Sequence, residues 1–96
     1  MRTLNEQPLA AILKELVSSP KFKKPFFLAK IQAAWEPLMG KTIAGYTKEI
    51  SISRNTLYIS IESASLRDEL GYGKEKIKSI LNEELGEDYL KDVVIR

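Results

Sequence analysis

The sequence contains no cysteine and no histidine among its 96 residues. Without cysteine the chain forms no disulfide and offers no thiolate to a metal. The two absences together exclude Cys/His nucleophile pairs, Ser-His-Asp triads and almost every transition-metal site. General acid/base catalysis near neutral pH is also hard to build without an imidazole or a thiol. We therefore expect a non-enzymatic protein with no metal, no cofactor and no small-molecule substrate.

Long apolar runs are missing as well. No stretch approaches the length of a membrane span, and residues 1–5 lack the apolar core of a signal peptide. We therefore expect a cytoplasmic protein that contacts no membrane. A chain of 96 residues, of which 44% are hydrophobic and 29% charged, suits one folded domain, so residues 1–96 are expected to form a single unit.

Charge is distributed unevenly along the chain, although the net charge is only +2. Residues 1–48 carry eight Lys/Arg against three Asp/Glu, a net +5, whereas residues 49–96 carry seven against ten, a net −3. The only compact basic cluster is Lys21-Phe22-Lys23-Lys24-Pro25. We interpret it as a solvated connector between helices whose Phe22 enters the core. The alternative is a contact with nucleic acid or with an acidic partner.

The stretch from Thr47 to Glu62 alternates apolar and polar residues around Arg54-Asn55, which predicts a β-hairpin. Asn55 tolerates the positive φ of a tight turn. A two-residue loop predicts an aliphatic face that pairs Ile52 with Leu57, Ile50 with Ile59 and Lys48 with Ile61. The opposite face then pairs Ser51 with Tyr58, Glu49 with Ser60 and Thr47 with Glu62. On that face Tyr58 is either a contact residue or a solvated side chain.

Two helices are predicted before the hairpin. The first runs from Asn5 to about Val17, with Leu9, Ile12, Leu13, Leu16 and Val17 in one apolar stripe. The second starts at Pro25 or Phe26, and Pro37 kinks or ends it. Its core face comprises Phe27, Ile31, Ala34, Trp35, Leu38 and Met39. We interpret Trp35 as a core anchor rather than a base-stacking platform. A short helical turn from Lys41 to Gly45 leads into the hairpin.

A long helix is predicted after the hairpin, with Ser65 and Asp68 capping its start and Gly86 ending it. Its apolar positions are Leu66, Leu70, Ile77, Ile80, Leu81 and Leu85. Gly71 and Gly73 interrupt this pattern, so they either let the helix approach the sheet closely or break it. The last segment, Tyr89–Arg96, predicts a third strand that could sit at a sheet edge. The fold class is therefore α+β in the order α-α-β-β-α-β, with helices covering a small three-stranded sheet.

Several segments together resemble the DciA-like family, long catalogued as a domain of unknown function. They are Ala34-Trp35, Leu38-Met39-Gly40, Ile43-Ala44, Tyr46-Thr47, Asn55-Thr56-Leu57-Tyr58-Ile59, Ser63, Leu66-Arg67, Glu69-Leu70, Leu81-Asn82-Glu83-Glu84 and Val93-Val94-Ile95-Arg96. The resemblance spans residues 5 to 96 and implies a KH-like two-layer domain in a bacterial cytoplasmic protein. It also implies a role in loading or operating the replicative helicase, with single-stranded DNA binding. Where a KH fold binds through a Gly-x-x-Gly loop between two helices, this chain has only Gly71-Tyr72-Gly73.

The residues and the resemblance together predict a binding domain that assists DNA replication. It would contact the replicative helicase, single-stranded DNA or RNA, or both. The candidate phosphate contacts are Lys21, Lys23, Lys24, Lys30 and Lys41, and their affinity for DNA should fall with salt. The alternative is a protein-protein adaptor that binds no nucleic acid. Its candidate partner contacts are Tyr58, Arg67 and Lys74.

Overall fold

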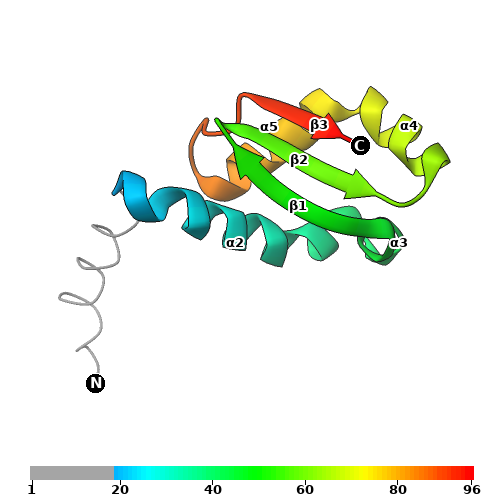
Figure 1. Cartoon of the computed structure of the whole chain (residues 1–96), viewed down its shortest axis with the longest axis horizontal. Helices are drawn as coiled ribbons and strands as arrows, with labels where there is room; N and C mark the ends of the chain where they lie inside the picture. The colour runs from blue at the N-terminus through cyan, green and yellow to red at the C-terminus, as the bar shows by residue number, and fades with distance from the viewer. Residues whose placement is uncertain (1–18) are drawn as a thin grey trace, which may run out of the picture.

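The computed structural model describes residues 19–96, so the helix predicted over Asn5 to Val17 lies outside the described residues. The element order is α2 (Pro20–Met39), α3 (Lys41–Tyr46), β1 (Thr47–Ser53), β2 (Thr56–Ile61), α4 (Ala64–Tyr72), α5 (Lys74–Leu85) and β3 (Asp92–Ile95). Figure 1 looks onto the sheet, with α5 behind it and α2 running alongside β1. The α+β class with a small three-stranded sheet is confirmed.

The sheet has the order β1-β2-β3, with β1 antiparallel and β3 parallel to the central strand β2. Arg54 and Asn55 form the predicted two-residue turn, with φ of 52° and 63°. Two successive positive φ values are those of a type I′ turn, whose twist matches that of the strands. The third strand lies at a sheet edge and is shorter than the predicted segment, since it spans Asp92–Ile95.

The hairpin register is confirmed near the turn, where Ile52 lies opposite Leu57 and Ile50 opposite Ile59. It is wrong at the far end, because Thr47 lies opposite Ile61 and Lys48 is the extra residue of a β-bulge. Neither predicted pair, Lys48 with Ile61 or Thr47 with Glu62, is formed. The bulge turns Thr47 toward the core, where a buried indole N–H needs an acceptor.

The core lies between the inner face of the sheet and the helices. Trp35 is 3% exposed, which confirms it as a core anchor, and its Nε1 donates to Thr47 Oγ1 at 2.8 Å. Thr47 Oγ1 in turn donates to the carbonyl of Ile43 at 2.7 Å. Leu38, predicted on the core face, is 41% exposed. The buried apolar residues are Phe27, Ile31, Trp35, Ile52, Leu57, Ile59, Ile61, Leu70, Ile77, Leu81, Leu85, Leu90 and Val93.

The start of α2 differs from the prediction. The helix begins at Pro20, and Ser19 caps it by accepting a hydrogen bond from the Lys21 amide at 3.3 Å. The basic cluster therefore lies on a helix and not in a connector. Pro25 does not interrupt this helix, although it removes one backbone hydrogen-bond donor. As a result Phe22 is 44% exposed, and the prediction that it enters the core is wrong.

The long helix predicted after the hairpin is broken at Gly73 into α4 and α5. Gly73 has φ −108° and ψ 22°, and only the carbonyl of Leu70, at 3.9 Å, lies near the position of a Cβ there. This glycine therefore marks a break rather than a close approach to the sheet. Ser63, not Ser65, caps α4 by accepting from the Leu66 amide at 3.3 Å. Gly86 ends α5 in the left-handed region, as predicted.

Candidate binding surfaces

The helix α2 carries four of the five candidate phosphate contacts. Lys21, Lys23, Lys24 and Lys30 lie on this helix, and residues 20–35 include no Asp or Glu. The first acidic residue of α2 is Glu36. Residues 20–35 are therefore a basic segment, held on the domain by the buried side chains of Phe27 and Ile31.

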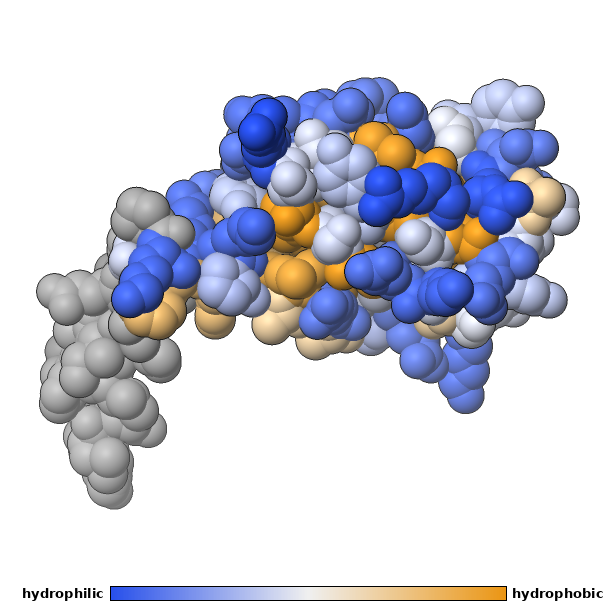
Figure 2. All heavy atoms as spheres, in the orientation of Figure 1, coloured by the Kyte–Doolittle hydropathy of each residue, from blue (hydrophilic) through white to orange (hydrophobic). Residues whose placement is uncertain are grey.

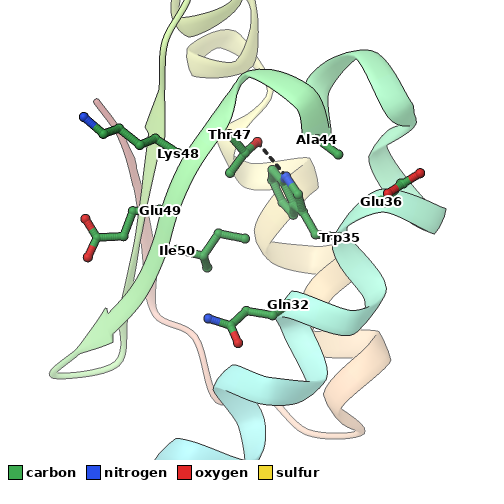
Figure 3. Close-up of a pocket in the computed structure, with 8 residues that line it drawn as sticks. All are labelled: Gln32, Trp35, Glu36, Ala44, Thr47, Lys48, Glu49 and Ile50. Atoms are coloured by element: carbon green, nitrogen blue, oxygen red, sulfur yellow. Dashed lines mark hydrogen bonds between the residues drawn. The ribbon is translucent and has the colours of Figure 1, made fainter.

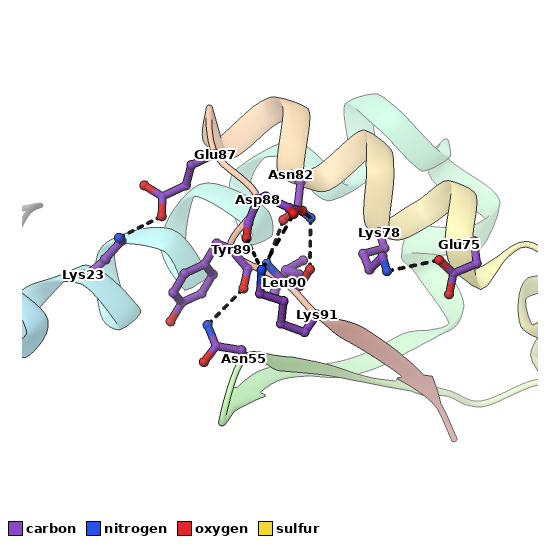
Figure 4. A network of polar contacts seen from close by, with 10 residues as sticks. All are labelled: Lys23, Asn55, Glu75, Lys78, Asn82, Glu87, Asp88, Tyr89, Leu90 and Lys91. Carbon is purple, nitrogen blue, oxygen red and sulfur yellow. Dashed lines mark hydrogen bonds and ion pairs between the residues drawn. The ribbon is translucent and has the colours of Figure 1, made fainter.

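Lys23 differs from the other three lysines because partners within the domain already hold it. Its Nζ lies 2.7 Å from Glu87 Oε2, in the loop after α5 (Figure 4). The same ammonium lies 5.7 Å from the ring centroid of Phe27 and 5.8 Å from that of Tyr89. Both rings belong to the packed side of the helix, where they meet edge to face at 4.8 Å. Lys23 therefore fastens α2 to the β3 side of the domain.

Lys21, Lys24 and Lys30 are exposed and take part in no ion pair among residues 19–96. Two exposed aromatic side chains stand between them, Phe22 at 44% and Phe26 at 43%. Lys21 Nζ lies 5.8 Å from the Phe22 ring centroid, and Lys30 Nζ lies 6.0 Å from that of Phe26. We call these five exposed residues of α2 the Lys/Phe surface, although Lys24, two residues from each phenylalanine, projects from another side of the helix. Hydrophilic and hydrophobic side chains adjoin at this end of the molecule (Figure 2).

Sequence reasoning missed the two phenylalanines. Phe22 and Phe26 are one helical turn apart, and Lys30 follows one turn later, so the three side chains share one side of α2. The buried positions Phe27 and Ile31 lie on the other side. A helix extended back to Pro20 would have revealed this arrangement, because the helical period then separates the two sets.

Lys41 does not join this surface. It is exposed at the first position of α3, beyond the far end of α2. A helix of 20 residues is roughly 30 Å long, which separates Lys41 from Lys21 by about that distance. The predicted set of five lysines therefore divides into three exposed residues on α2, one residue held within the domain (Lys23), and one distant residue (Lys41).

The outer face of the sheet carries Tyr58. On the central strand Tyr58 is half-buried and lies opposite Ser51 on one side and Val94 on the other. The guanidinium of Arg96 lies 4.7 Å from its ring centroid. No described helix covers this face, which Figure 2 shows from the front as polar side chains with hydrophobic patches between them. Tyr58 is therefore accessible together with the stacked Arg96.

Arg67 and Lys74 lie on other elements than Tyr58. Arg67 is on α4, and its Nη1 donates to the carbonyl of Ile61 at 2.6 Å, which ties α4 to the end of β2. Lys74 is half-buried at the start of α5. Its neighbour Tyr72 is 91% exposed. The three predicted partner contacts come from three elements, and no hydrogen bond or ion pair among the described residues joins them.

One family model matches this chain, that of the family described as Dna[CI] antecedent, DciA, and the match covers residues 8–95. The chain belongs to the DciA family. The match includes all the helices and strands described above, from α2 to β3. Neither a curated protein nor a solved structure matches the chain. Family membership confirms the resemblance seen in the sequence and places the domain in the context of DNA replication.

Among the described residues of this DciA-family domain, two surface grooves adjoin α2. One, of about 510 Å³, runs between α2 and β1 and is lined by Gln32, Trp35, Glu36, Ala44 and Thr47–Ile50 (Figure 3). The other, of about 320 Å³, lies between α2 and α5. In the part of the chain that the structure describes, no three His, Cys, Asp or Glu side chains gather to hold a metal ion. Within the same part, no helix is both long and apolar enough to cross a membrane.

Proposed function

We propose that this domain is a non-enzymatic binding module that assists DNA replication by contacting single-stranded nucleic acid, the replicative helicase, or both. Membership in the DciA family supports the replication context. The absence of His and Cys from the sequence supports binding rather than catalysis. On this proposal the protein works in the bacterial cytoplasm, without a cofactor.

The Lys/Phe surface is the observation that carries the nucleic-acid part of the proposal. Proteins that bind single strands without sequence preference combine a basic path for the backbone with aromatic side chains on which bases stack. Lys21, Lys24 and Lys30 supply the charge, and Phe22 and Phe26 supply exposed rings between them. Because no acidic residue occurs between positions 20 and 35, nothing within this helical segment opposes a phosphate.

The order β2-α4-α5-β3, with β3 parallel to β2, supports a KH-like interpretation of the fold. In KH domains a Gly-x-x-Gly loop between two helices clamps the nucleic-acid backbone. Here the two helices meet at Gly71-Tyr72-Gly73, one residue short of that motif. The proposal therefore assigns the main contact to α2 and uses Tyr72 as a control position.

The test measures the binding of fluorescently labelled single-stranded DNA to the full chain at low and moderate salt. We expect the triple variant Lys21→Gln, Lys24→Gln, Lys30→Gln to bind at least about tenfold more weakly, since each lost phosphate contact removes counterion release. The double variant Phe22→Ala, Phe26→Ala should also lose about tenfold or more, because stacking contributes about 1–3 kcal/mol per base.

Two matched controls separate this surface from general charge and from the α4–α5 junction. The triple variant Lys41→Gln, Lys74→Gln, Lys76→Gln removes the same charge elsewhere and should bind within about twofold of the wild type. Tyr72→Ala removes the most exposed aromatic ring in the described structure and should bind normally. Absence of binding at low salt, or equal losses in both triple variants, would contradict the nucleic-acid proposal.

A second candidate function is a protein-protein adaptor, favoured by the uncovered sheet face around Tyr58 and Arg96. On this alternative the contacts are Tyr58 on the sheet, Arg67 on α4 and Lys74 on α5. Co-purification with the replicative helicase, combined with no DNA binding at low salt, would support it. Loss of that co-purification in Tyr58→Ala, but not in the neighbouring Ser60→Ala, would locate the contact on the sheet.

A further inference from the structure

The two edges of the sheet differ in how their outward backbone groups are satisfied. At the β3 edge, one outward donor is covered, because the Val93 amide donates to Oδ1 of Asp92 at 2.8 Å; the outward groups of Ile95 have no such partner among the described residues. At the β1 edge no described side chain or backbone group does the same. An edge with open N–H and C=O groups is a template for another strand.

The turn fixes which groups of β1 face outward. Ser53 and Thr56 flank a two-residue loop, so they exchange both backbone hydrogen bonds, and the pattern repeats at every second residue. Ile50 and Ile52 therefore occupy the alternate positions, where backbone groups point away from β2. The free edge of β1 thus offers two N–H and two C=O groups to a neighbouring strand.

The other side of β2 gives the same assignment independently. The Ile61 amide donates to the carbonyl of Arg96 at 2.7 Å, and the Arg96 amide donates to the carbonyl of Ile59 at 2.8 Å. Ile59 and Ile61 therefore use their backbone groups toward the β3 side. Ile50 lies opposite Ile59, so its own backbone groups cannot be used by β2 and point to the free edge.

The groove of about 510 Å³ lies directly beside this edge. Figure 3 shows Ile50 and Gln32 pointing into the space between β1 and α2, whereas Lys48 and Glu49 point away from α2. Ile50 is only half-buried, unlike Ile52, which is 4% exposed. An apolar part of the groove is therefore open next to the free backbone groups of Ile50.

We propose that the β1 edge and this groove bind an extended segment of a partner protein, which joins the sheet as a fourth strand. Its backbone would bond to Ile50 and Ile52, and the side chain opposite Ile50 would enter the groove toward Trp35. That side chain is apolar, because Ile50, Ala44 and Trp35 line the groove. The backbone groups favour an extended peptide over a nucleic-acid strand, which has no matching row of amides.

Charge and shape further restrict the segment. Three charged residues line the groove, but Lys48 and Glu49 have opposite charges and point away from α2 (Figure 3). The remaining one, Glu36, belongs to no ion pair in the described part of the chain, so one basic residue beside the apolar one suits the groove. The bulge at Lys48 bends the strand and ends the flat edge, which limits the docked segment to about four residues. This site does not depend on nucleic-acid binding by the Lys/Phe surface, because it uses other residues.

The test uses the full chain and a display library of random seven-residue peptides as the probe. Selection on the wild type with counter-selection on Gln32→Trp should enrich peptides with an apolar residue beside a basic one. Bound to the wild type, such peptides should slow amide hydrogen exchange of Ile50 and Ile52 at least about tenfold. The amides of Ser51 and Ser53 already bond to β2 and should not change.

Three variants complete the test. Gln32→Trp fills the groove from the exposed side of α2, and Ile50→Pro removes an outward edge donor, so each should weaken the selected peptides about tenfold, or about 1.4 kcal/mol. Ala33→Trp adds the same ring one residue away, outside the groove, and should bind like the wild type. If Ile50→Pro fails to fold, the comparison of Gln32→Trp with Ala33→Trp still shows whether the peptides bind in the groove.

Three results would overturn the inference. One is a selection that enriches no peptide over the Gln32→Trp counter-selection. Another is protection of amides outside β1 by the enriched peptides. The third is a concentration-dependent dimer that protects Ile50 and Ile52 without any peptide, since a second copy of the chain would then be the occupant. DNA binding by the Lys/Phe surface would be unaffected by any of the three.

Discussion

Phe27 on the inner face of α2 is 5% exposed, whereas Phe26, the residue before it, is 43% exposed on the outer face. Phe27 packs against Tyr89 and lies in the core, while Phe26 lies beside Lys30 on the Lys/Phe surface. The two residues have the same side chain and lie on the same helix. The difference shows that α2 carries more apolar side chains than the core buries. The exposed ring of Phe26 lies next to a lysine instead.

The largest effect should come from removing the inner ring. Phe27→Ala should lower the free energy of unfolding by about 3–5 kcal/mol, since it leaves a cavity in the core. Phe26→Ala should lower it by less than about 1 kcal/mol, because its ring is already partly in water. Urea denaturation of both variants measures this difference. Equal losses would mean that both faces of α2 are packed in solution.

A smaller loss of stability is expected from changing Asn82, a buried polar residue of the described structure. Asn82 on α5 is 9% exposed, and its side chain donates to the carbonyl of Leu90 at 3.0 Å and accepts from the Leu90 amide at 2.8 Å. It also donates to Asp88 Oδ1 at 3.0 Å (Figure 4). This residue therefore fixes the loop that leads into β3.

Asn82→Ala should cost about 2–3 kcal/mol of unfolding free energy, because both backbone groups of the buried Leu90 lose their partner. The matched control is Glu83→Ala at the next, exposed position, which should change stability by less than about 0.5 kcal/mol. Urea denaturation serves again as the measurement. A neutral Asn82→Ala would show that water replaces the side chain in the loop.

The sequence predicted the parts of the fold that local rules determine. The hairpin follows from a period of two and from a turn residue, Asn55, that tolerates a positive φ. The buried positions of α2 and of the helices after the hairpin follow from the helical period. The end of α5 follows from Gly86, which adopts the left-handed conformation common after a helix. Each of these features is decided by residues close together in the chain.

The errors fall where distant residues or competing local rules decide. The bulge at Lys48 turns Thr47 toward the indole of Trp35, a contact between two elements that the alternation of β1 does not encode. The sequence predicts that α2 starts at Pro25 or Phe26, yet Ser19 caps an earlier start at Pro20 and the helix accommodates Pro25. That difference alone moved Phe22 from the predicted core to the surface.

The candidate site was predicted in part, for the same reason. The basic cluster was visible in the sequence, but its division into exposed and engaged lysines was not. Lys23 is engaged because Glu87 and Tyr89, far along the chain, lie next to it in the fold. Lys24, its neighbour, has no such partner among residues 19–96.

The smallest predicted effect distinguishes these two adjacent lysines, of which Lys23 is held within the domain and Lys24 is exposed. Lys24→Gln should lower the slope of log affinity for single-stranded DNA against log salt by about 0.7, the value for one lost phosphate contact. Lys23→Gln should leave that slope unchanged and cost less than about 1 kcal/mol of unfolding free energy, since its ion pair with Glu87 is partly exposed to solvent. Titrations at several salt concentrations and urea denaturation measure the two quantities. A slope that falls equally in both variants would mean that DNA competes with Glu87 for Lys23, and Lys23 would then belong to the DNA-binding surface.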